Sequence, residues 1–514
     1  MQRGVRYAVS QKTAVAVVYV AAIFLSTMDT TIVNVALPAI GRAFSVQPTS
    51  VDVVSISYLV SLAVFVPASG WLGDRFGGKR TLLTAVAVFT IASALCGMAS
   101  SLSELVLFRV LQGAGGGMLA SVGLAMLLRA FPPEARVRLA AMLTFATGLA
   151  PTLGPVLGGL LVTDLSWRLV FYVNVPVGIC VTVFGALFLR RDTSRQPGGF
   201  DAAGFLLAAA GLGLAMYGVS AGPNRGWSSA EVLGSIVPGV VLLGLLVVVE
   251  LRRAAPIMDV RLLKDRLFAS GSAIMAIESV AFLGTLYTIS LYFQDGRGLS
   301  PLASGLSTFP EAVGVMTGSQ LGSRLLYRKL GPRGHLALGV AASSLCIALL
   351  GVLGTGTSLW LVRIVLFFMG VAVGQVFVAT QAASFATVSP AASGRASTLF
   401  NVGRRLGGAI GVAVATTAIV LVRAHDHAAA SGVQPVSYRV AFLVAAAINL
   451  VGLWPMRVVR DRDAAGTIPQ PRRRRSLHFP SPSHPQIGKK GRNDDDVVLG
   501  SGVADRGRGA EQGA

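Results

Sequence analysis

Long apolar runs recur along this chain, and they restrict its possible folds more than any other feature. Each run has about twenty or more residues, the length that a helix needs to cross a hydrocarbon core about 30 Å thick. Hydrophobic residues make up 53% of the sequence and charged residues only 13%, so water cannot be the solvent for most of the chain. We therefore predict an all-α membrane protein embedded in the lipid bilayer.

The distribution of basic residues supports a count of fourteen spans. Lys and Arg in short loops resist translocation and stay cytoplasmic, and alternate loops collect most of them when the N-terminus is placed inside. We expect a multi-pass protein of the cytoplasmic (inner) membrane with both termini in the cytoplasm. The expected spans are residues 14–38, 50–73, 81–100, 104–128, 138–163, 168–189, 203–221, 231–251, 267–293, 302–327, 334–354, 358–382, 397–422 and 439–459.

The first span resembles a signal peptide, because Arg3, Arg6 and Lys12 precede it. Its apolar run extends over residues 14–38, which is too long for a cleaved segment. It also contains Asp29 and no convincing cleavage site. We expect it to remain as the first helix.

Several classes of function lack the residues that they need. The net charge is +21, but the basic residues lie between apolar runs and in the tail, so nucleic acid is not an expected partner. The run QGAGGG at 112–117 matches no phosphate-binding loop, and the motif His425-Asp426-His427 has no further metal ligands nearby. No catalytic set is apparent. We predict a transport protein rather than an enzyme, with no metal or cofactor and with an ion gradient as its energy source.

The two halves of the sequence repeat each other at an offset of about 250 residues. The stretch Gly70–Arg80 corresponds to Gly322–Arg333, and Leu105–Met118 corresponds to Leu359–Gly374. Parallel repeats of six spans are typical of transporters that handle substrate near the midplane of the bilayer. We expect one six-helix bundle in residues 1–195, two inserted helices in 196–265, a second bundle in 266–460, and a disordered basic cytoplasmic tail in 461–514.

Five short motifs occur in order on the expected spans. They are Asp29–Pro38 (DTTIVNVALP), Gly70–Arg80 (GWLGDRFGGKR), Arg109-x-x-Gln112-Gly113, Gly148 with Gly154-Pro155-x-x-Gly158-Gly159, and Trp167-Arg168-x-x-Phe171-x-x-Asn174-x-Pro176-x-Gly178. With these motifs the chain resembles the fourteen-helix drug:proton antiporter family of the major facilitator superfamily, over about residues 14–459. The resemblance implies a major facilitator fold of two six-helix bundles plus two additional helices. It also implies proton-coupled efflux of hydrophobic or cationic small molecules such as drugs and antibiotics.

Asp29 is the first candidate for proton coupling. A charge at its depth costs about 2.5–3.5 kcal/mol unless it is paired, hydrated or protonated. It must therefore face the protein interior, where its protonation could change as water access alternates. The local alternative is that Asp29 only bonds its neighbours Thr30, Thr31 or Asn34.

Two further ionisable residues complete this set. For Arg109, the resemblance implies a part in proton coupling, and the alternative is a fixed counter-charge between helices. Its repeat mate Arg363 is expected to be structural. The repeat places Glu278 on the counterpart of the first span, so we expect Glu278 opposite Asp29 across a cavity, as a second proton or cation site.

The stretch of residues 70–80 is expected to reverse the chain between two helices. Glycine permits the turn, and Asp74 can cap a helix or pair with an arginine. The resemblance implies that this loop is a gate latch, whereas the alternative is an ordinary solvated turn. In the second half Tyr327 stands at the position of Asp74, so we expect an acidic latch only in the first half. The predicted gating residues are Gly70, Asp74, Arg75, Gly77, Lys79 and Arg80.

Glycines in the fifth span form a stripe that permits close helix packing. Its members are Gly148, Gly154, Gly158 and Gly159, with Pro155 adding a bend. Packing alone would explain the glycines. The resemblance implies more, because the Gly-Pro pair within the stripe marks exporters in that family.

Three polar residues are candidates for lining the substrate cavity, namely Asn34, Gln112 and Glu311. Glu311 could instead face water near the outer end of its span. The expected partners are a small-molecule substrate, protons and the bilayer, with the chain acting as a monomer. Two alternatives stay open: a dedicated exporter of a self-made metabolite, and a membrane-bound sensor or scaffold that has lost transport.

Overall fold

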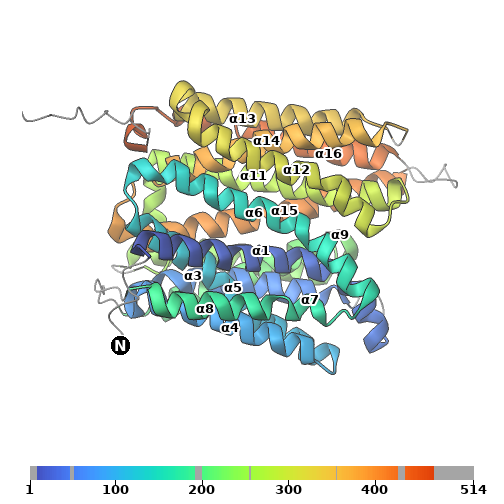
Figure 1. The fold of residues 1–514 in the computed structure, drawn as a ribbon, viewed down its shortest axis with the longest axis horizontal. Helices are drawn as coiled ribbons and strands as arrows, with labels where there is room; N and C mark the ends of the chain where they lie inside the picture. Colours follow the sequence, from blue (N-terminus) through green and yellow to red (C-terminus); the bar gives the residue numbers. More distant parts are fainter. Residues whose placement is uncertain are drawn as a thin grey trace, which may run out of the picture. The chain divides into compact units, whose positions relative to one another are not determined.

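The computed structural model describes residues 9–46, 51–190, 199–253, 256–354, 356–425 and 435–467. Within these ranges the chain is helical and has no strand, as predicted (Figure 1). The α-helices are α1 (Gln11–Phe44), α3 (Val53–Phe76), α4 (Gly78–Met98), α5 (Leu102–Ala130), α6 (Arg136–Asp164), α7 (Leu169–Tyr172), α8 (Asn174–Phe188), α9 (Ala202–Arg225), α10 (Ala230–Arg252), α11 (Arg266–Leu291), α12 (Pro301–Leu321), α13 (Tyr327–Val352), α14 (Leu359–Ser384), α15 (Ser393–His425) and α16 (Pro435–Val451).

Thirteen helical stretches of the described chain are long and apolar enough to cross a membrane. One of them, Leu302–Val352, has 51 residues. At about 1.5 Å per residue it would be more than twice as long as a bilayer core is thick. It is interrupted at Gly331, where φ is 69° and ψ is 168°, and both of its parts, α12 and α13, pack against α14. The chain turns back at Gly331, so this stretch crosses twice and accounts for the fourteenth predicted span.

The two ends of the described chain meet at the same connection between helices. Lys12 Nζ lies 5.8 Å from the centroid of the Phe131 ring, at the start of the α5–α6 connection. The short helix η8 (Ala465–Thr467) packs against η2 (Pro133–Ala135) in that same connection. An even number of crossings returns a chain to the side where it began, which agrees with fourteen spans. We refer to this end of the helices as the predicted cytoplasmic end.

The same packing pairs occur in both halves of the sequence. In the N-terminal half α1 packs on α6, α3 on α5 and α4 on α8, and in the C-terminal half α11 packs on α15, α12 on α14 and α13 on α16. Between the halves, α6 packs on α12 and α15 on α3, which are again corresponding pairs. The helices without counterparts, α9 and α10, pack against each other, and α9 also contacts α3 and α15.

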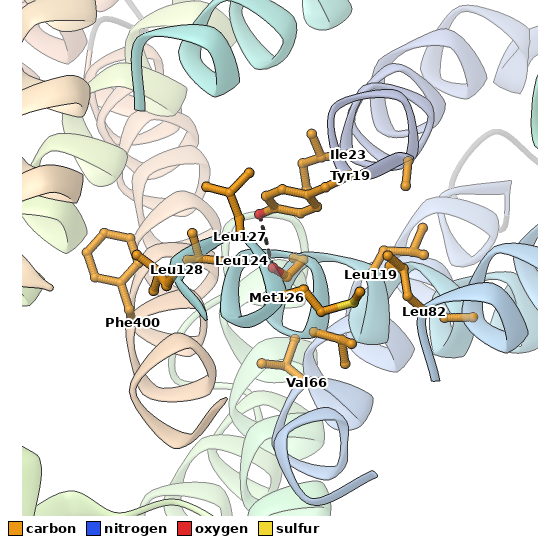
Figure 2. Packing of buried hydrophobic residues seen from close by; sticks show 14 of the residues in the cluster. Tyr19, Ile23, Val66, Leu82, Leu119, Leu124, Met126, Leu127, Leu128 and Phe400 are labelled. Carbon is orange, nitrogen blue, oxygen red and sulfur yellow. Dashed lines mark hydrogen bonds between the residues drawn. The ribbon is translucent and has the colours of Figure 1, made fainter. Parts of the chain in front are cut away.

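One large apolar core contains side chains from both halves. Figure 2 shows Tyr19 of α1 above Leu127 of α5, with Phe400 of α15 beside Leu128. The hydroxyl of Tyr19 donates to the carbonyl oxygen of Ala120 at 3.0 Å, which satisfies a polar group in this core. Helix α15 of the second half is therefore anchored against α5 of the first.

Glycines in α5 let this helix approach its neighbours closely. A Cβ atom at Gly117 would lie 2.3 Å from the carbonyl oxygen of Leu62 on α3, and one at Gly115 would lie 2.7 Å from the amide nitrogen of Phe89 on α4. No larger residue fits at either position without moving a helix backbone. The glycine run of α5 therefore serves helix packing inside the bundle.

The chain beyond the last span remains packed as far as residue 467. The hydroxyl of Tyr327 shares a hydrogen bond of 2.7 Å with Thr467 Oγ1, and both side chains are buried. Asp461 Oδ1 accepts a hydrogen bond of 2.8 Å from the backbone N–H of Arg333, just after the α12–α13 turn. The first seven residues of the predicted tail, 461–467, thus belong to the folded part, and residues 468–514 lie outside the described ranges.

Candidate functional site

An ion pair is buried inside the N-terminal half. Asp29 lies on α1 and Arg109 on α5, and Arg109 Nη1 donates to Asp29 Oδ2 at 2.6 Å. Their side chains are 0% and 1% exposed. A buried charge without a partner costs several kcal/mol, so each of these residues explains how the other is tolerated. Two residues that were singled out separately in the sequence are in direct contact.

Side chains from two further helices complete this site. Gln112 Nε2 and Asn174 Nδ2 donate to Asp29 Oδ1 at 2.9 and 3.0 Å. Both amides also reach Ser93 Oγ, at 3.0 and 3.2 Å. Ser93 lies on α4 and Asn174 at the start of α8, so side chains from α5 and α8 reach the carboxylate of α1 and α4 joins through the two amides. We call Asp29, Ser93, Arg109, Gln112 and Asn174 the Asp29 network.

Two residues of helix α3 also contact the guanidinium of Arg109. Arg109 Nε donates to the carbonyl oxygen of Val54 at 3.2 Å, and Arg109 Cζ lies 4.0 Å from the centroid of the Tyr58 ring, whose face attracts a cation. Arg109 Nη1 donates in addition to Gln112 Oε1 of α5 at 2.6 Å. The hydroxyl of Tyr58 in turn donates to the carbonyl oxygen of Ser26 at 3.2 Å. Arg109 thus keeps partners that do not depend on Asp29.

The local alternative for Asp29 is wrong in this structure. The hydroxyls of Thr30 and Thr31 donate to backbone carbonyls of α1. Asn34 is exposed, and its Oδ1 accepts a hydrogen bond from a serine of α3 at 3.0 Å. Of the predicted cavity residues, Asn34 therefore lies apart from the Asp29 network, whereas Gln112 belongs to it.

The C-terminal half contains a similar polar cluster without an arginine in it. Glu278 on α11 is fully buried beside Ser343 of α13 and Asn449 of α16. Asn449 Nδ2 donates to Ser343 Oγ at 2.7 Å, and neither carboxyl oxygen of Glu278 has a hydrogen-bond partner among the described residues. The three residues lie on the helices that correspond to those of Asp29, Ser93 and Asn174.

The two acidic candidates face the interiors of their own halves. The hydrogen bonds of Asp29 go to α5 and α8, and the polar neighbours of Glu278 lie on α13 and α16. The expectation that they stand opposite each other across one cavity is not met in this structure, because each carboxyl group is enclosed by helices of its own half. A role for Glu278 as a proton or cation site remains a prediction.

Two other polar residues of the C-terminal half are also enclosed. Arg363 Nη2 donates to Ser307 Oγ at 3.0 Å, and its Cζ lies 5.1 Å from the centroid of the Trp360 ring. Glu311 on α12 is only 2% exposed, so the alternative that it faces water is excluded here. Its Oε1 has no hydrogen-bond partner within the described ranges.

A second ion pair lies where the two halves meet at the predicted cytoplasmic end. Arg129 Nη2 donates to Asp74 Oδ1 at 2.6 Å, and Arg129 Nε donates to the carbonyl oxygen of Pro390, shortly before α15, at 3.3 Å. A Cβ atom at Gly394, in the first turn of α15, would lie 3.3 Å from both carboxyl oxygens of Asp74. A carboxylate is favourable beside a helix N-terminus. We call Asp74, Arg129 and the first turn of α15 the inner latch.

The other predicted gating residues occupy different positions. Gly70 lies where α3 meets α15, and a Cβ atom there would be 2.8 Å from Thr398 Oγ1. Gly77 has a φ of 87°, which glycine adopts without strain, and it makes the turn into α4. Lys79 Nζ donates to two carbonyl oxygens at the end of α8, one of them at 2.7 Å. Two basic side chains of the loop are exposed, those of Arg75 and Arg80.

Two glycines of the predicted stripe bring α6 close to α1. A Cβ atom at Gly154 would lie 2.1 Å from Thr31 Oγ1 and 2.9 Å from the amide nitrogen of Ile32. One at Gly158 would lie 3.0 Å from the carbonyl oxygen of Ile32. Because these contacts begin two residues after Asp29, the stripe sets the position of the helix that carries the buried acid.

The rest of the stripe serves other contacts. A Cβ atom at Gly148 would lie 2.7 Å from Val315 Cγ1 on α12, across the boundary between the halves. Gly159 has no atom within 4 Å of its Cβ position. Pro155 lies within α6, but its side chain is outside the described set.

Some residues of the site were not singled out from the sequence. Ser93 was missed, and Asn174 entered only as one letter of a motif. Both have counterparts on the corresponding helices of the second half, Ser343 and Asn449, so a search for polar residues shared by corresponding spans could have found them. Arg129 was considered only as a positive charge that marks a cytoplasmic loop, and its partner was not predicted.

The Asp29 network places one carboxyl group within hydrogen-bond distance of one guanidinium and two side-chain amides. Over the described ranges, no group of three or more His, Cys, Asp or Glu side chains could hold a metal ion. Asp426 and His427 of the loop that was weighed as a metal ligand lie outside those ranges.

A helical fold with repeated packing pairs and a buried ion pair defines the class of this chain as a polytopic membrane transporter. A family model described as "Major Facilitator Superfamily" matches residues 19–412, well over half of the chain. The chain belongs to this superfamily.

The relatives agree with this assignment. The "Multidrug resistance protein B homolog" of Mycobacterium tuberculosis (strain ATCC 25618 / H37Rv) is 32% identical over 401 residues, which cover 77% of this chain and 74% of the relative. The "Tetracenomycin C resistance and export protein" of Streptomyces glaucescens is 30% identical over 76% of this chain and 73% of its own length. These matches confirm the resemblance to multidrug exporters that the motifs indicated.

A solved structure confirms the fold. The human organic anion transporter MFSD10 (TETRAN) superposes with a TM-score of 0.62 over 87% of this chain and 99% of that chain. Its sequence identity is 17%, so this likeness supports the fold alone.

Proposed function

We propose that this chain is a proton-driven antiporter that exports hydrophobic small molecules, including drugs, across the cytoplasmic membrane by alternating access. The buried Asp29–Arg109 pair carries the proposal, because a carboxylate paired at membrane depth is a group that one proton can switch. Similarity to proteins named for multidrug resistance and tetracenomycin C export supports the kind of cargo. The chain works as a monomer with both termini in the cytoplasm.

In the proposed cycle a proton from outside binds Asp29 and removes the charge that holds Arg109. Arg109 retains the Val54 carbonyl and the Tyr58 ring as partners, so its interactions shift from α1 towards α3. On the inner side Asp29 releases the proton and the pair forms again. The protonation state of Asp29 thereby changes with the side of the membrane to which the site is open.

The energies of these steps are comparable. Removing one charge of a buried pair costs about 3–5 kcal/mol. One proton that crosses with roughly 100 mV and one pH unit releases about 3.7 kcal/mol. A single carboxyl group is therefore enough to couple the gradient to a change of conformation, and no other energy source is needed.

The inner latch is the proposed inner gate. Its ion pair is formed here, and Arg136 Nη1 of α6 also donates to the carbonyl oxygen of Phe385 in the other half, which supports this assignment. Helix α3 carries both Tyr58, which contacts Arg109, and Asp74, which belongs to the latch. A shift of α3 on protonation would therefore act at both places.

Dye uptake into inverted membrane vesicles tests this function. Two dyes with the same xanthene ring system are used, rhodamine 123 as a cation and fluorescein as an anion. We expect energised vesicles to accumulate at least one of them and an uncoupler to abolish this accumulation. The change Asp29→Asn should lower gradient-driven accumulation at least tenfold while exchange of dye across the membrane continues.

The control is Val17→Ala, on the same helix but 46% exposed and outside the Asp29 network. It should transport like the wild type. If neither dye enters energised wild-type vesicles, the proposed export function is wrong. If Asp29→Asn accumulates dye as the wild type does, export stands and coupling through Asp29 is wrong.

A further inference from the structure

Two adjacent arginines, Arg404 and Arg405, lie in the middle of α15. They are about 18 Å along the helix from its first residue, at a rise of about 1.5 Å per residue. In a hydrocarbon core about 30 Å thick this is close to the midplane. Two cations at such a depth require an acceptor, an anion or water.

Arg405 has no protein partner for its buried donors. Its Nε and Nη2 atoms are buried and make no hydrogen bond to any described residue. Neither Arg404 nor Arg405 forms an ion pair with a carboxylate of the described chain. Arg109 reaches Asp29 and Arg363 reaches Ser307, although Arg363 Nε is also buried without a hydrogen-bond partner within the described ranges. The usual structural role of an intramembrane arginine therefore does not account for this pair.

The position of Arg405 on α15 directs it towards the other half. Gly394, Thr398 and Arg405 are spaced by four and then seven residues, so they share one face of the helix. At its first two positions this face contacts α3, through Asp74 and Gly70. The opposite packing face is built from glycines that lie against α11. Arg405 thus belongs to the face that meets the N-terminal half.

Helices α3 and α5 of the N-terminal half pack against α15 across this boundary. The buried acid of that half, Asp29, is already paired with Arg109. Arg404 and Arg405 are only partly buried, so part of each side chain is accessible, while the enclosed Nε and Nη2 atoms of Arg405 lack a partner among the described residues.

We propose that Arg404 and Arg405 form an anion-binding subsite on the transport route, which receives the acidic group of a hydrophobic substrate. A guanidinium donates in a planar fork that fits a carboxylate, sulfonate or phenolate. The inference rests on the proposed export function and narrows its cargo. It also reverses the charge suggested by the family resemblance, since a cationic substrate would meet two like charges here.

The fluorescein and rhodamine 123 pair tests this subsite, because the two dyes share a ring system and differ in charge. Uptake into inverted vesicles is measured over a range of dye concentrations for the wild type, Arg405→Gln and Arg405→Lys. We expect Arg405→Gln to raise KM for fluorescein at least tenfold and to leave KM for rhodamine 123 unchanged or lower it, because a like charge is removed. Arg405→Lys keeps the charge but loses the fork, so its KM for fluorescein should lie between the two.

Arg363→Gln is the matched control, an intramembrane arginine whose partner is Ser307. It should leave the preference between the dyes unchanged. Equal losses for both dyes in Arg405→Gln, or no change for either, would overturn the subsite.

A binding measurement separates this inference from the export function. Fluorescence anisotropy of fluorescein with purified protein should show binding to the wild type and at least tenfold weaker binding to Arg405→Gln. Wild-type vesicles that export rhodamine 123 but not fluorescein would overturn the subsite and leave export standing. Binding without uptake of either dye would retain the subsite and contradict export.

Discussion

Asp29 and Glu278 lie on corresponding helices, but their neighbours give them different tasks. Asp29 has the guanidinium of Arg109 beside it, so its charged form is compensated in this state. Glu278 has only the amide of Asn449 and the hydroxyl of Ser343 nearby, and it forms no ion pair among the described residues. An unpaired carboxylate is far more costly to bury than a carboxylic acid. We infer that Glu278 carries a proton in this conformation.

The substitution Glu278→Gln tests that inference. Glutamine has the shape of the neutral acid, so the free energy of unfolding should change by less than about 1 kcal/mol. Transport of rhodamine 123, the cationic dye, should fall or lose its dependence on the gradient, because the residue can no longer ionise. Melting temperature and dye uptake are measured together, with the exposed Glu134→Gln as the control. Unchanged coupling would remove Glu278 from the mechanism.

At the scale of helices, close approach positions the site. Helix α6 can lie against α1 only because Gly154 and Gly158 have no side chains, and α1 carries Asp29. Helix α3 links the Asp29 network to the inner latch through Tyr58 and Asp74. The same small-residue contacts that stabilise the bundle therefore determine where its charges sit.

Gly154→Val should disturb the α1–α6 contact severely. Its Cβ would meet Thr31 Oγ1 and the Ile32 backbone, and overpacking of this kind costs about 1–3 kcal/mol or more. We expect a lower melting temperature and at least a tenfold loss of dye uptake. Gly159→Ala, where no atom lies within 4 Å, is the matched control and should behave like the wild type. Equal tolerance of both changes would contradict the packing role of the stripe.

Asp74→Asn should weaken the inner latch. A partly exposed ion pair contributes about 1 kcal/mol, which corresponds to about a fivefold change in the fraction of molecules with the inner end closed. A single cysteine placed at Thr398, where α15 meets Gly70, should then react faster with a thiol reagent from the inner side. The exposed neighbour Arg75→Gln serves as the control. No difference in labelling rate between the two variants would exclude the latch.

At the scale of the whole chain, an even number of crossings is the central claim. It depends on the turn at Gly331, where one apolar stretch of 51 residues becomes two spans. It also explains why Lys12 and the η8 segment meet the same α5–α6 connection. A chain with thirteen crossings would end on opposite sides of the membrane.

Cysteine labelling from either side of the membrane tests this count. In a background without Cys96, Cys180 and Cys346, we expect Lys329→Cys to react only from the cytoplasm and Gly356→Cys only from outside. Both positions are exposed; Lys329 lies before the kink of α13 at Gly331, and Gly356 follows the end of that helix. Labelling of both positions from the same side would mean that α13 does not cross, and the fourteen-span architecture would be wrong.

How far the sequence alone could go differs between fold and site. The spans, their helical form and the superfamily were predictable, because apolar length and short motifs are local properties of the chain. Asp29, Arg109 and Gln112 were also recognised, since polar residues are conspicuous in apolar spans. Ser93, which contacts Gln112, and Arg129, which pairs with Asp74, were not recognised. A serine in a span or an arginine near a loop is common, and its role depends on which helix packs against it.

The sequence by itself determined that this chain crosses the bilayer, how often it does so and which buried charges need an explanation. The tertiary structure alone decided which charges pair. It joined Asp29 to Arg109, kept Glu278 away from both, and left Arg405 without an acceptor at the boundary between the halves. The physical reason is that the cost of burying a charge can be read from its depth, whereas relief of that cost depends on groups that helix packing brings together from distant parts of the chain.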